Sequence, residues 1–481
     1  MVIILLFNSL NYLIFLPLVF TMFILTNSKY RWLILLIASY YFYMSWNPAY
    51  ILLIVISTII SYLTALKMGK ISEKADRKPY LYMSLFLNLG LLFIFKYYNF
   101  FNDSLTHYLS LPMYLPTFDL LLPVGISFYT FQALSYTIDV YRSTKEPEKH
   151  FGIYALYVSF FPQLVAGPIE RSTHLLPQFR EKYKFNYGKT VSGLRLILWG
   201  FFLKLAIADN VAPIVNAIYN NVHDYTGAPL IIATIFFAYQ IFCDFAGYSY
   251  IAIGSARILG FDLMDNFKSP YMSRSFSEFW RRWHISLSTW FRDYLYIPLG
   301  GNRVSKLRHS LNLFIVFLVS GLWHGANWTF IIWGGIHGAY LVVENTIMQL
   351  LNGKELKSNI FLDILKVMVV FSFVSFAWIF FRANDISDAL YVCTHLFTGI
   401  FSTPASEVLE KFYSLGFGAY LFLKIVGSIA ILEFVHLMQI TRFGKCNALK
   451  TYARWPIYYF LIFWILLNGA FQSNEFIYFQ F

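Results

Sequence analysis

Charged residues are scarce in this chain. Asp, Glu, Lys and Arg make up 13% of its 481 residues and hydrophobic residues make up 58%, whereas soluble domains contain roughly 25% charged residues. A chain with so few charged and so many hydrophobic residues is not expected to be surrounded mainly by water. The composition therefore excludes an ordinary soluble enzyme and predicts a protein that crosses a membrane several times.

Cysteine is also rare. Cys243, Cys393 and Cys446 are far apart in the chain and fit neither a metal-ligand spacing nor a disulfide framework. We interpret all three as buried apolar thiols and expect no metal site. The apolar N-terminal segment lacks the basic start and the small-residue cleavage site of a signal peptide, so residues 1–26 are predicted to form a first membrane span.

The net charge of +12 does not indicate nucleic-acid binding, because the basic residues lie in short loops between apolar runs. Basic loops of this kind orient a membrane protein and contact anionic lipid headgroups. Aromatic residues reach 21% of the chain, which suits wide boundaries between lipid and water.

The apolar runs predict an all-α polytopic membrane protein with about eleven transmembrane helices in one domain, residues 1–481. Two further apolar stretches, 151–168 and 311–343, are interrupted by Gly, Pro or His and are predicted to be broken or re-entrant. Irregular backbone at membrane depth is tolerated only inside protein or beside a water-filled cavity. The other expected spans are 31–46, 49–66, 80–101, 121–141, 191–208, 228–255, 361–381, 415–438 and 455–471.

Loop charges predict the orientation. Loops 67–79 and 441–454 are rich in Lys and Arg and are expected on the cytoplasmic side. Loops 102–120 and 209–227 contain neither Lys nor Arg and are expected outside. Counting spans from these anchors places both termini outside the cytoplasm, provided that 151–168 does not cross fully and that 311–343 enters the membrane and returns.

The longest polar stretch, 256–310, contains a predicted amphipathic helix that starts at an S-x-x-E capping box, Ser275 and Glu278. With about 100° per residue, His284 falls on the aromatic face of this helix. The helix is too polar to span a membrane, so we expect it along the cytoplasmic face. One face carries Phe276, Trp280, Trp283, Leu287, Phe291 and Tyr294, and the other carries Glu278, Arg281, Arg282, Thr289, Arg292 and Asp293.

His324 is the strongest candidate for chemistry, because it lies within the apolar run 314–328. An ionisable group in such a run is costly and is a functional candidate by default. A neutral imidazole accepts a proton from a hydroxyl near pH 7 and returns it, as acyl transfer requires. A buried histidine bonded to a backbone carbonyl is the alternative.

Three other features stay open on residue type alone. Asp139 and Asp244 either orient a histidine, pair with an arginine, or are structural carboxylates at helix ends. The turn 298–303, Pro-Leu-Gly-Gly-Asn-Arg, either cradles a phosphate through its backbone N–H groups or simply ends the amphipathic helix.

At these residues the chain resembles the membrane-bound O-acyltransferase (MBOAT) family, in particular the branch of the bacterial alginate O-acetyltransferase membrane subunit and similar polysaccharide acetylation proteins. The resemblance covers residues 120–343 densely. Its motifs are Phe161-Pro-Gln-Leu-Val-Ala-Gly-Pro-Ile-Glu-Arg171, Asp244-Phe-Ala-Gly-Tyr248, Glu278-Phe-Trp-Arg-Arg-Trp-His284-Ile-Ser-Leu287, Trp290-Phe-Arg-Asp-Tyr-Leu-Tyr-Ile-Pro-Leu-Gly-Gly-Asn-Arg303 and Ser320-Gly-Leu-Trp-His-Gly-Ala-Asn-Trp328.

The resemblance implies that His324 is the catalytic histidine in a central tunnel and His284 a second motif histidine on the cytoplasmic approach. It implies an acyl-thioester donor, with acetyl-CoA expected, and an extracytoplasmic SGNH-hydrolase-like partner that acetylates a polysaccharide. The expected location is the bacterial cytoplasmic membrane. The residues expected to contact substrates are Arg281, Arg282, Trp283, Arg303, Asn327 and Asp244.

The C-terminal tail, residues 472–481, is expected outside the cytoplasm and offers Tyr478 among phenylalanines. Similar aromatic tails with a tyrosine end some relatives or their small partner peptides. Our hypothesis is that the tail enters the extracytoplasmic funnel and Tyr478 carries the acyl group transiently. An interfacial aromatic anchor is the alternative.

Two other functions remain. Within acyl transfer, the alternative is D-alanyl or longer-chain transfer from a carrier protein. A transporter or flippase is the alternative from another class, but it predicts interrupted helices in two matching halves, and the sequence has no such symmetry.

Overall fold

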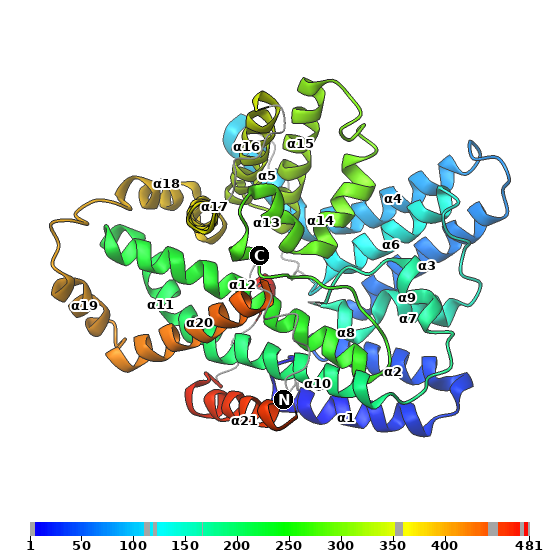
Figure 1. The fold of residues 1–481 in the computed structure, drawn as a ribbon. Helices are drawn as coiled ribbons and strands as arrows, with labels where there is room; N and C mark the ends of the chain where they lie inside the picture. Colours follow the sequence, from blue (N-terminus) through cyan, green and yellow to red (C-terminus); the bar gives the residue numbers. More distant parts are fainter. Residues whose placement is uncertain are drawn as a thin grey trace. The chain divides into compact units, whose positions relative to one another are not determined.

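The computed structural model describes residues 5–109, 116–118, 123–165, 167–351, 359–440, 451–471 and 476–479. Two compact units make up the chain, the first from Met1–Ile197 and Ser249–Asp265, the second from Leu198–Tyr248 and Asn266–Phe481. Helices dominate the described residues of both (Figure 1). The predicted all-helical class is thereby confirmed, whereas a single domain over 1–481 stays a prediction.

The helices follow the apolar runs of the sequence. In the first unit they are α1 (Leu10–Leu25), α2 (Arg31–Met44), α3 (Tyr50–Gly69), α4 (Lys78–Leu92), α5 (Tyr98–Leu109), α6 (Ile126–Tyr141), α7 (Phe151–Ser159), α8 (Phe161–Leu164) and α9 (Ser172–Gln178). In the second they are α11 (Asp209–Tyr219), α13 (Phe276–Arg282), α14 (Ile285–Phe291), α15 (Lys306–His324), α16 (Trp328–Leu350), α17 (Ile360–Arg382), α18 (Ile386–His395), α19 (Ala405–Ser414), α20 (Ala419–Ile440) and α21 (Thr451–Asn468).

Two helices, α10 (Tyr187–Phe201) and α12 (Ala228–Ile258), have residues in both units. Single helical turns of the 3₁₀ type lie at Ser28–Tyr30, Val222–Asp224, Pro270–Met272 and Ile477–Phe479. Wider π-helical turns lie at Phe93–Tyr97, Phe202–Ala208 and Arg292–Tyr296. Such π-helical turns are rare and concentrate at functional sites.

Among the described residues, six helical segments are long and apolar enough to cross a membrane. They are Tyr50–Gly69, Lys78–Thr106, Tyr187–Tyr219, Ala228–Ile258, Ile360–Arg382 and Ala419–Ile440. The polytopic character is therefore confirmed, and the number of about eleven spans stays a prediction. Most of the basic loop 441–454 lies outside the described residues.

The first predicted span needs a correction. Its helix begins at Leu10, not at the N-terminus, because the hydroxyl of Ser9 accepts the N–H of Tyr12 and caps the helix. The described residues before Ser9 are not helical.

Both interrupted stretches are interrupted in the structure. Phe160 separates α7 from α8, and residues 325–327 separate α15 from α16. The second break directly follows His324. The sequence therefore located this candidate at a true helix end.

Helices α15 and α16 lie side by side as an antiparallel hairpin (Figure 1). Two glycines permit the close approach. A Cβ atom on Gly321 would lie 2.2 Å from the carbonyl oxygen of Phe330, and one on Gly334 would lie 2.2 Å from that of Phe317. The backbones of the two helices are thus in direct contact close to His324 and to the break that follows it.

We predict that Gly334→Ala destabilises the protein, although alanine normally favours a helix. The methyl group has no room, and overpacking of this kind costs about 1–3 kcal/mol. The neighbouring Gly335→Ala is the matched control, because its new Cβ meets nothing closer than 3.5 Å; it should be neutral or stabilising by up to about 1 kcal/mol. Thermal unfolding of both variants in detergent tests this, and equal midpoints would contradict it.

Candidate active site

The predicted amphipathic helix at 276–294 is broken in the structure, which corrects the prediction of one continuous helix. Helix α13 ends at Arg282 and α14 begins at Ile285, and His284 has φ 42° in the left-handed region. Such a conformation costs a residue with a side chain about 1–3 kcal/mol and is common at functional sites. The N–H of Ile285 donates to the carbonyl of Asn266 (2.9 Å) and stabilises the break.

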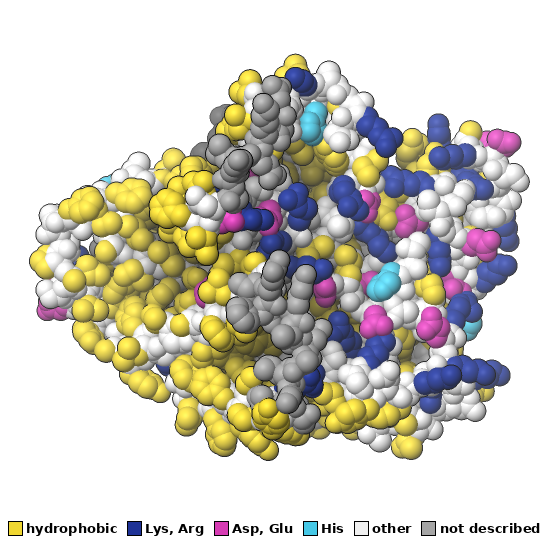
Figure 2. All heavy atoms as spheres, in the orientation of Figure 1, with side chains coloured by type: hydrophobic (Ala, Val, Ile, Leu, Met, Phe, Trp, Pro, Cys, Tyr) yellow, Lys and Arg dark blue, Asp and Glu magenta, His cyan; other side chains and the backbone are white. Residues whose placement is uncertain are grey.

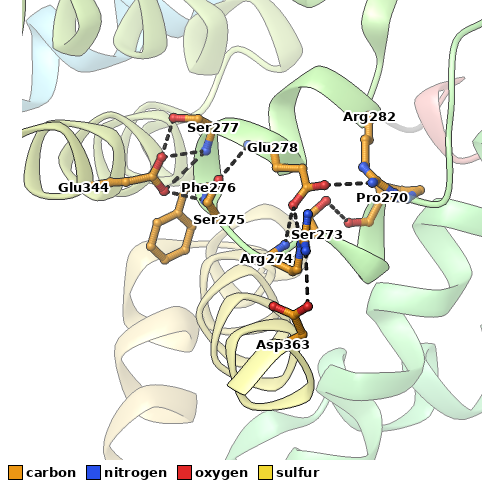
Figure 3. Close-up of polar contacts among 10 residues, drawn as sticks. All are labelled: Pro270, Ser273, Arg274, Ser275, Phe276, Ser277, Glu278, Arg282, Glu344 and Asp363. Atoms are coloured by element: carbon orange, nitrogen blue, oxygen red, sulfur yellow. Dashed lines mark hydrogen bonds and ion pairs between the residues drawn. The ribbon is translucent and has the colours of Figure 1, made fainter. Parts of the chain in front are cut away.

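The start of α13 agrees with half of the predicted capping box. The hydroxyl of Ser275 accepts the N–H of Glu278 (3.0 Å), but the Glu278 carboxylate accepts the N–H of Arg274 (2.7 Å) in place of that of Ser275. Glu344, from α16, accepts the N–H groups of Phe276 (2.6 Å) and Ser277 (3.2 Å) (Figure 3). An acidic side chain at a helix N-terminus is favourable, so α16 fixes the position of α13.

His324 is the last residue of α15 and its side chain is 5% exposed. Its ring lies edge-on to that of Trp333, with centroids 5.0 Å apart, and 5.6 Å from that of Phe381. The aromatic packing restricts the imidazole to a few orientations. The end of α15 and the rings of Trp333 and Phe381 together hold the imidazole of His324 at the break between α15 and α16.

The second motif histidine lies next to the first. The ring centroids of His284 and His324 are 6.3 Å apart, and His284 is 2% exposed with Phe245 at 4.6 Å. His284 lies outside the six spanning segments, and burial lowers the pKa of its imidazole well below 6.5, with His324 adding to the shift. His284 is therefore neutral near pH 7.

The tail residue Tyr478 lies in the same cluster. Its ring centroid is 5.8 Å from that of His324 and 4.7 Å from that of Phe245. The hydroxyl oxygen of Tyr478 is enclosed. The structure therefore brings together the three side chains that sequence reasoning named for chemistry, although they are as much as 194 residues apart in the chain (478 − 284).

A buried ion-pair network holds this tail, and sequence reasoning missed its central residue. Lys204 is 1% exposed and its Nζ lies 2.7 Å from Oδ1 of Asp244 and 2.8 Å from Oδ1 of Asp209. The other oxygen of Asp244 accepts the N–H of Ile477 (2.8 Å), next to Tyr478. Lys204 stands within the apolar run 197–208, and that signal was sufficient to find it.

The π-helical turn Phe202–Ala208 supplies further contacts to the C-terminal segment. The carbonyl of Leu205 accepts the N–H of Ala470 (3.0 Å). The side-chain amide of Asn210 donates to the carbonyls of Leu205 (3.0 Å) and Asn468 (2.8 Å). The widened turn therefore anchors the end of α21 as well as presenting Lys204.

Structural contacts account for three of the remaining predicted residues, Trp283, Arg282 and Asn327. Trp283 is 1% exposed and packs 5.1 Å from Trp378. Arg281 is exposed, and Arg282 pairs with Glu278 (2.7 Å). The side chain of Asn327 caps α16 by accepting the N–H of Thr329, and Asp139 is buried near the end of α6.

Arg303 lies on the exposed turn 298–303, where the structure favours the simpler of the two interpretations. The N–H groups of Gly300, Gly301 and Arg303 already donate to backbone carbonyls. Asn312 donates to the carbonyls of Leu299 and Gly301 (3.1 Å each) and braces the turn. Three backbone donors needed for a phosphate cradle are therefore engaged.

A cavity of about 480 Å³ lies beside α13, α14 and α15 in the second unit. Arg281 and Arg292 contribute charge to a lining that is otherwise mostly apolar, with Trp280 and Phe317 in its wall. Ser320 also lines it, and this residue precedes His324 by one helical turn. The cavity is thus a mostly apolar space with two arginines in its lining, and it lies one helical turn away from His324.

Comparison with known proteins decides the family. The model described as "MBOAT, membrane-bound O-acyltransferase family" matches residues 40–383. The chain belongs to the membrane-bound O-acyltransferase family. It is accordingly an O-acyltransferase of the membrane, as the motifs predicted.

Similar proteins are named as acyltransferases. "Probable alginate O-acetylase AlgI" of Pseudomonas aeruginosa is 39% identical over 401 residues, covering 82% of this chain and 75% of that protein. "Peptidoglycan O-acetyltransferase" of Helicobacter pylori is 36% identical, covering 79% and 77%. "Teichoic acid D-alanyltransferase" of Streptococcus thermophilus is 31% identical, and the match covers 47% of this chain and 57% of that protein.

We predict that Lys204→Met detaches the tail and destabilises the protein by about 3–5 kcal/mol, because it leaves two buried carboxylates without their cation. Lys411→Met is the control: Lys411 pairs with Glu407 at 3.4 Å on an exposed helix face, and such pairs contribute about 1 kcal/mol or less. Thermal unfolding and protease cleavage of the tail would report both effects. A tail as protected in Lys204→Met as in the control would contradict the anchoring role.

Proposed function

We propose that this O-acyltransferase moves an acetyl group from a cytoplasmic thioester to an extracytoplasmic polysaccharide. The observation that carries the proposal is the cluster of His324, His284 and Tyr478 at the break between α15 and α16. Relatives named for alginate and peptidoglycan O-acetylation support acetate as the group and a polysaccharide as its destination. The acetyl group then passes to an extracytoplasmic partner of the SGNH-hydrolase-like type, which modifies the polysaccharide.

The cavity beside α13 and α14 is the proposed approach for the donor. Acetyl-CoA presents phosphates at one end and a slim thioester arm at the other. Arg281 and Arg292 supply positive charge at the cavity, and guanidinium groups suit phosphate oxygens. Arg282 and Arg303, with the neighbouring Lys306, add positive charge on α13 and the turn 298–303. In this proposal the protein lies in the cytoplasmic membrane with both termini outside.

His324 is the proposed general base. Its imidazole takes a proton from the attacking hydroxyl, the hydroxyl oxygen forms a bond to the thioester carbonyl carbon, and the carbon–sulfur bond breaks. The proton returns to the thiolate, which leaves as a thiol. His284, neutral and packed beside His324, keeps a second positive charge out of the site.

Tyr478 is the proposed first acceptor. Burial raises the pKa of its hydroxyl, so the phenol needs a base to react, and His324 is its neighbour. His324 takes the phenol proton as the phenolic oxygen bonds to the acetyl carbon and the carbon–sulfur bond breaks, and the proton then passes from His324 to the leaving thiolate. An acceptor hydroxyl next attacks the phenyl ester, the bond between the acetyl carbon and the phenolic oxygen breaks, and the acceptor's proton passes through His324 to the phenolate, which regenerates Tyr478. The contact between Ile477 and Asp244 supports this role because it holds the tail at the histidines.

D-alanyl transfer is the less supported alternative. The D-alanyltransferase relative covers 47% of this chain, whereas the alginate relative covers 82%. A carrier-protein donor would require a protein footprint on α13 and α14.

We predict that His324→Ala abolishes polysaccharide O-acetylation while the protein still inserts. Loss of a general base lowers rates about 10²–10⁴-fold. The measurement is cell-surface acetate in a deletion strain complemented with each variant, with membrane levels checked. His223→Ala, an exposed histidine paired with Asp388, is the control and should retain acetylation. Normal acetate from the His324 variant would refute the catalytic assignment.

A second prediction separates the relay from direct transfer. Tyr478→Phe keeps the aromatic ring and the Asp244 contact to the backbone of Ile477, but removes the hydroxyl, so a relay enzyme should lose acetylation. Tyr413→Phe, on the exposed surface of α19, should be unaffected. If Tyr478→Phe acetylates normally while His324→Ala does not, the hydroxyl is not a carrier and the acceptor reacts directly.

A further inference from the structure

A polar pocket of about 230 Å³ in the first unit has no part in the chemistry described above. It lies among the turn that joins α1 to α2, the segment 178–189 and residues 259–261 after α12. Its basic lining residues are Arg31, Lys182, Lys184 and Lys189, against one acid, Glu181. Basic side chains, with several acidic ones among them, also lie over the part of this unit that contains α2 and α9 (Figure 2).

Two of these cations build the walls of the pocket. Arg31 donates to the carbonyls of Phe23 (3.0 Å) and Thr26 (3.1 Å), and so satisfies the last carbonyls of α1. Lys189 donates to the carbonyl of Gly260 (2.6 Å) and pairs with Asp262 (2.7 Å). Both side chains are therefore fixed before any ligand arrives.

The other two cations are uncommitted. Lys182 and Lys184 are exposed, and neither forms an ion pair with any residue that the structure describes. Glu181 is the one acidic residue in the lining, and its single negative charge is outnumbered by the two positive charges of these lysines. The pocket thus has an excess of positive charge that no described side chain neutralises.

Tyr183 also lines this pocket, and its hydroxyl lacks a partner among the described residues. Its oxygen is enclosed and makes no hydrogen bond to the described part of the chain. The ring is held in place: it stacks under the guanidinium of Arg31 at 5.5 Å and lies against Gly260, where a Cβ would come within 2.6 Å of it. An enclosed hydroxyl donor among cations matches an anionic oxygen.

We propose that this pocket binds a phosphate group, carried by the headgroup of an anionic phospholipid. Lys182 and Lys184 supply charge, Tyr183 donates its hydroxyl, and Arg31 forms the rigid wall. This proposal is independent of the acyl-transfer mechanism.

The surroundings of the pocket favour a lipid over a soluble phosphate. Leu25, at the end of α1, is 81% exposed, and Phe185 and Tyr187 are 60% and 74% exposed beside the two lysines. Large apolar and aromatic side chains at such positions suit the boundary between headgroups and acyl chains. Basic pockets at helix ends on the cytoplasmic side are suited to anionic headgroups, and the loop charges predict that side for this turn.

The test uses the full chain in a neutral detergent. Phosphatidylglycerol, phosphatidylcholine, glycerol phosphate and inorganic phosphate are each titrated, and binding is followed by native mass spectrometry and by the unfolding midpoint. Phosphatidylglycerol should bind saturably and raise the midpoint, and phosphatidylcholine should not. If inorganic or glycerol phosphate raises the midpoint as much, the lipid assignment is overturned in favour of a soluble phosphate.

Variants locate the site. Lys182→Gln with Lys184→Gln should weaken phosphatidylglycerol binding on the order of tenfold, since each basic residue near an anionic headgroup contributes. Tyr183→Phe should weaken it by about threefold to tenfold through the lost hydrogen bond. Lys67→Gln with Lys70→Gln, two exposed lysines of the same unit outside the pocket, is the matched control. Equal affinities in the Lys182/Lys184 variant and the control would overturn the proposal.

Discussion

The arrangement of the candidate active site depends on one buried charge, the ammonium group of Lys204. A cation at 1% exposure is tolerable only with carboxylates in contact, and Asp209 and Asp244 supply them. Asp244 has one oxygen on the lysine and one on the N–H of Ile477. The ion pair and the docking of the tail are thus parts of one network, and Tyr478 reaches His324 because that network exists.

Three polar side chains of this candidate site stand where a regular α-helix is interrupted. His284 stands at a left-handed residue between α13 and α14, His324 at the end of α15, and Lys204 inside a π-helical turn. Each interruption places a polar side chain, or leaves a backbone polar group outside the regular helical hydrogen bonding, in surroundings that are otherwise apolar. Irregular backbone of this kind is stable in a membrane protein only where protein encloses it, and here aromatic rings do so.

Much of this organisation could be predicted. Periodicity and apolar length located the helices, and the Gly and His residues within 311–343 indicated the break beside His324. The capping signal at Ser275 placed the start of α13 correctly. It was not possible to predict the break at His284, since no Pro or Gly marks it and the contacts of Asn266 that stabilise it come from outside the helix.

By itself, the sequence determined the class of protein, the approximate positions of most helices and the candidate side chains for chemistry, because these depend on local composition and on motifs. Tertiary structure decided which of them meet. The distance between His324 and Tyr478, the pairing of Asp244 with Lys204 in place of an arginine, and the engagement of the amides in the turn 298–303 all depend on residues far apart in the chain. Such contacts arise from packing and from the need to neutralise buried charge, and neither is written in local sequence.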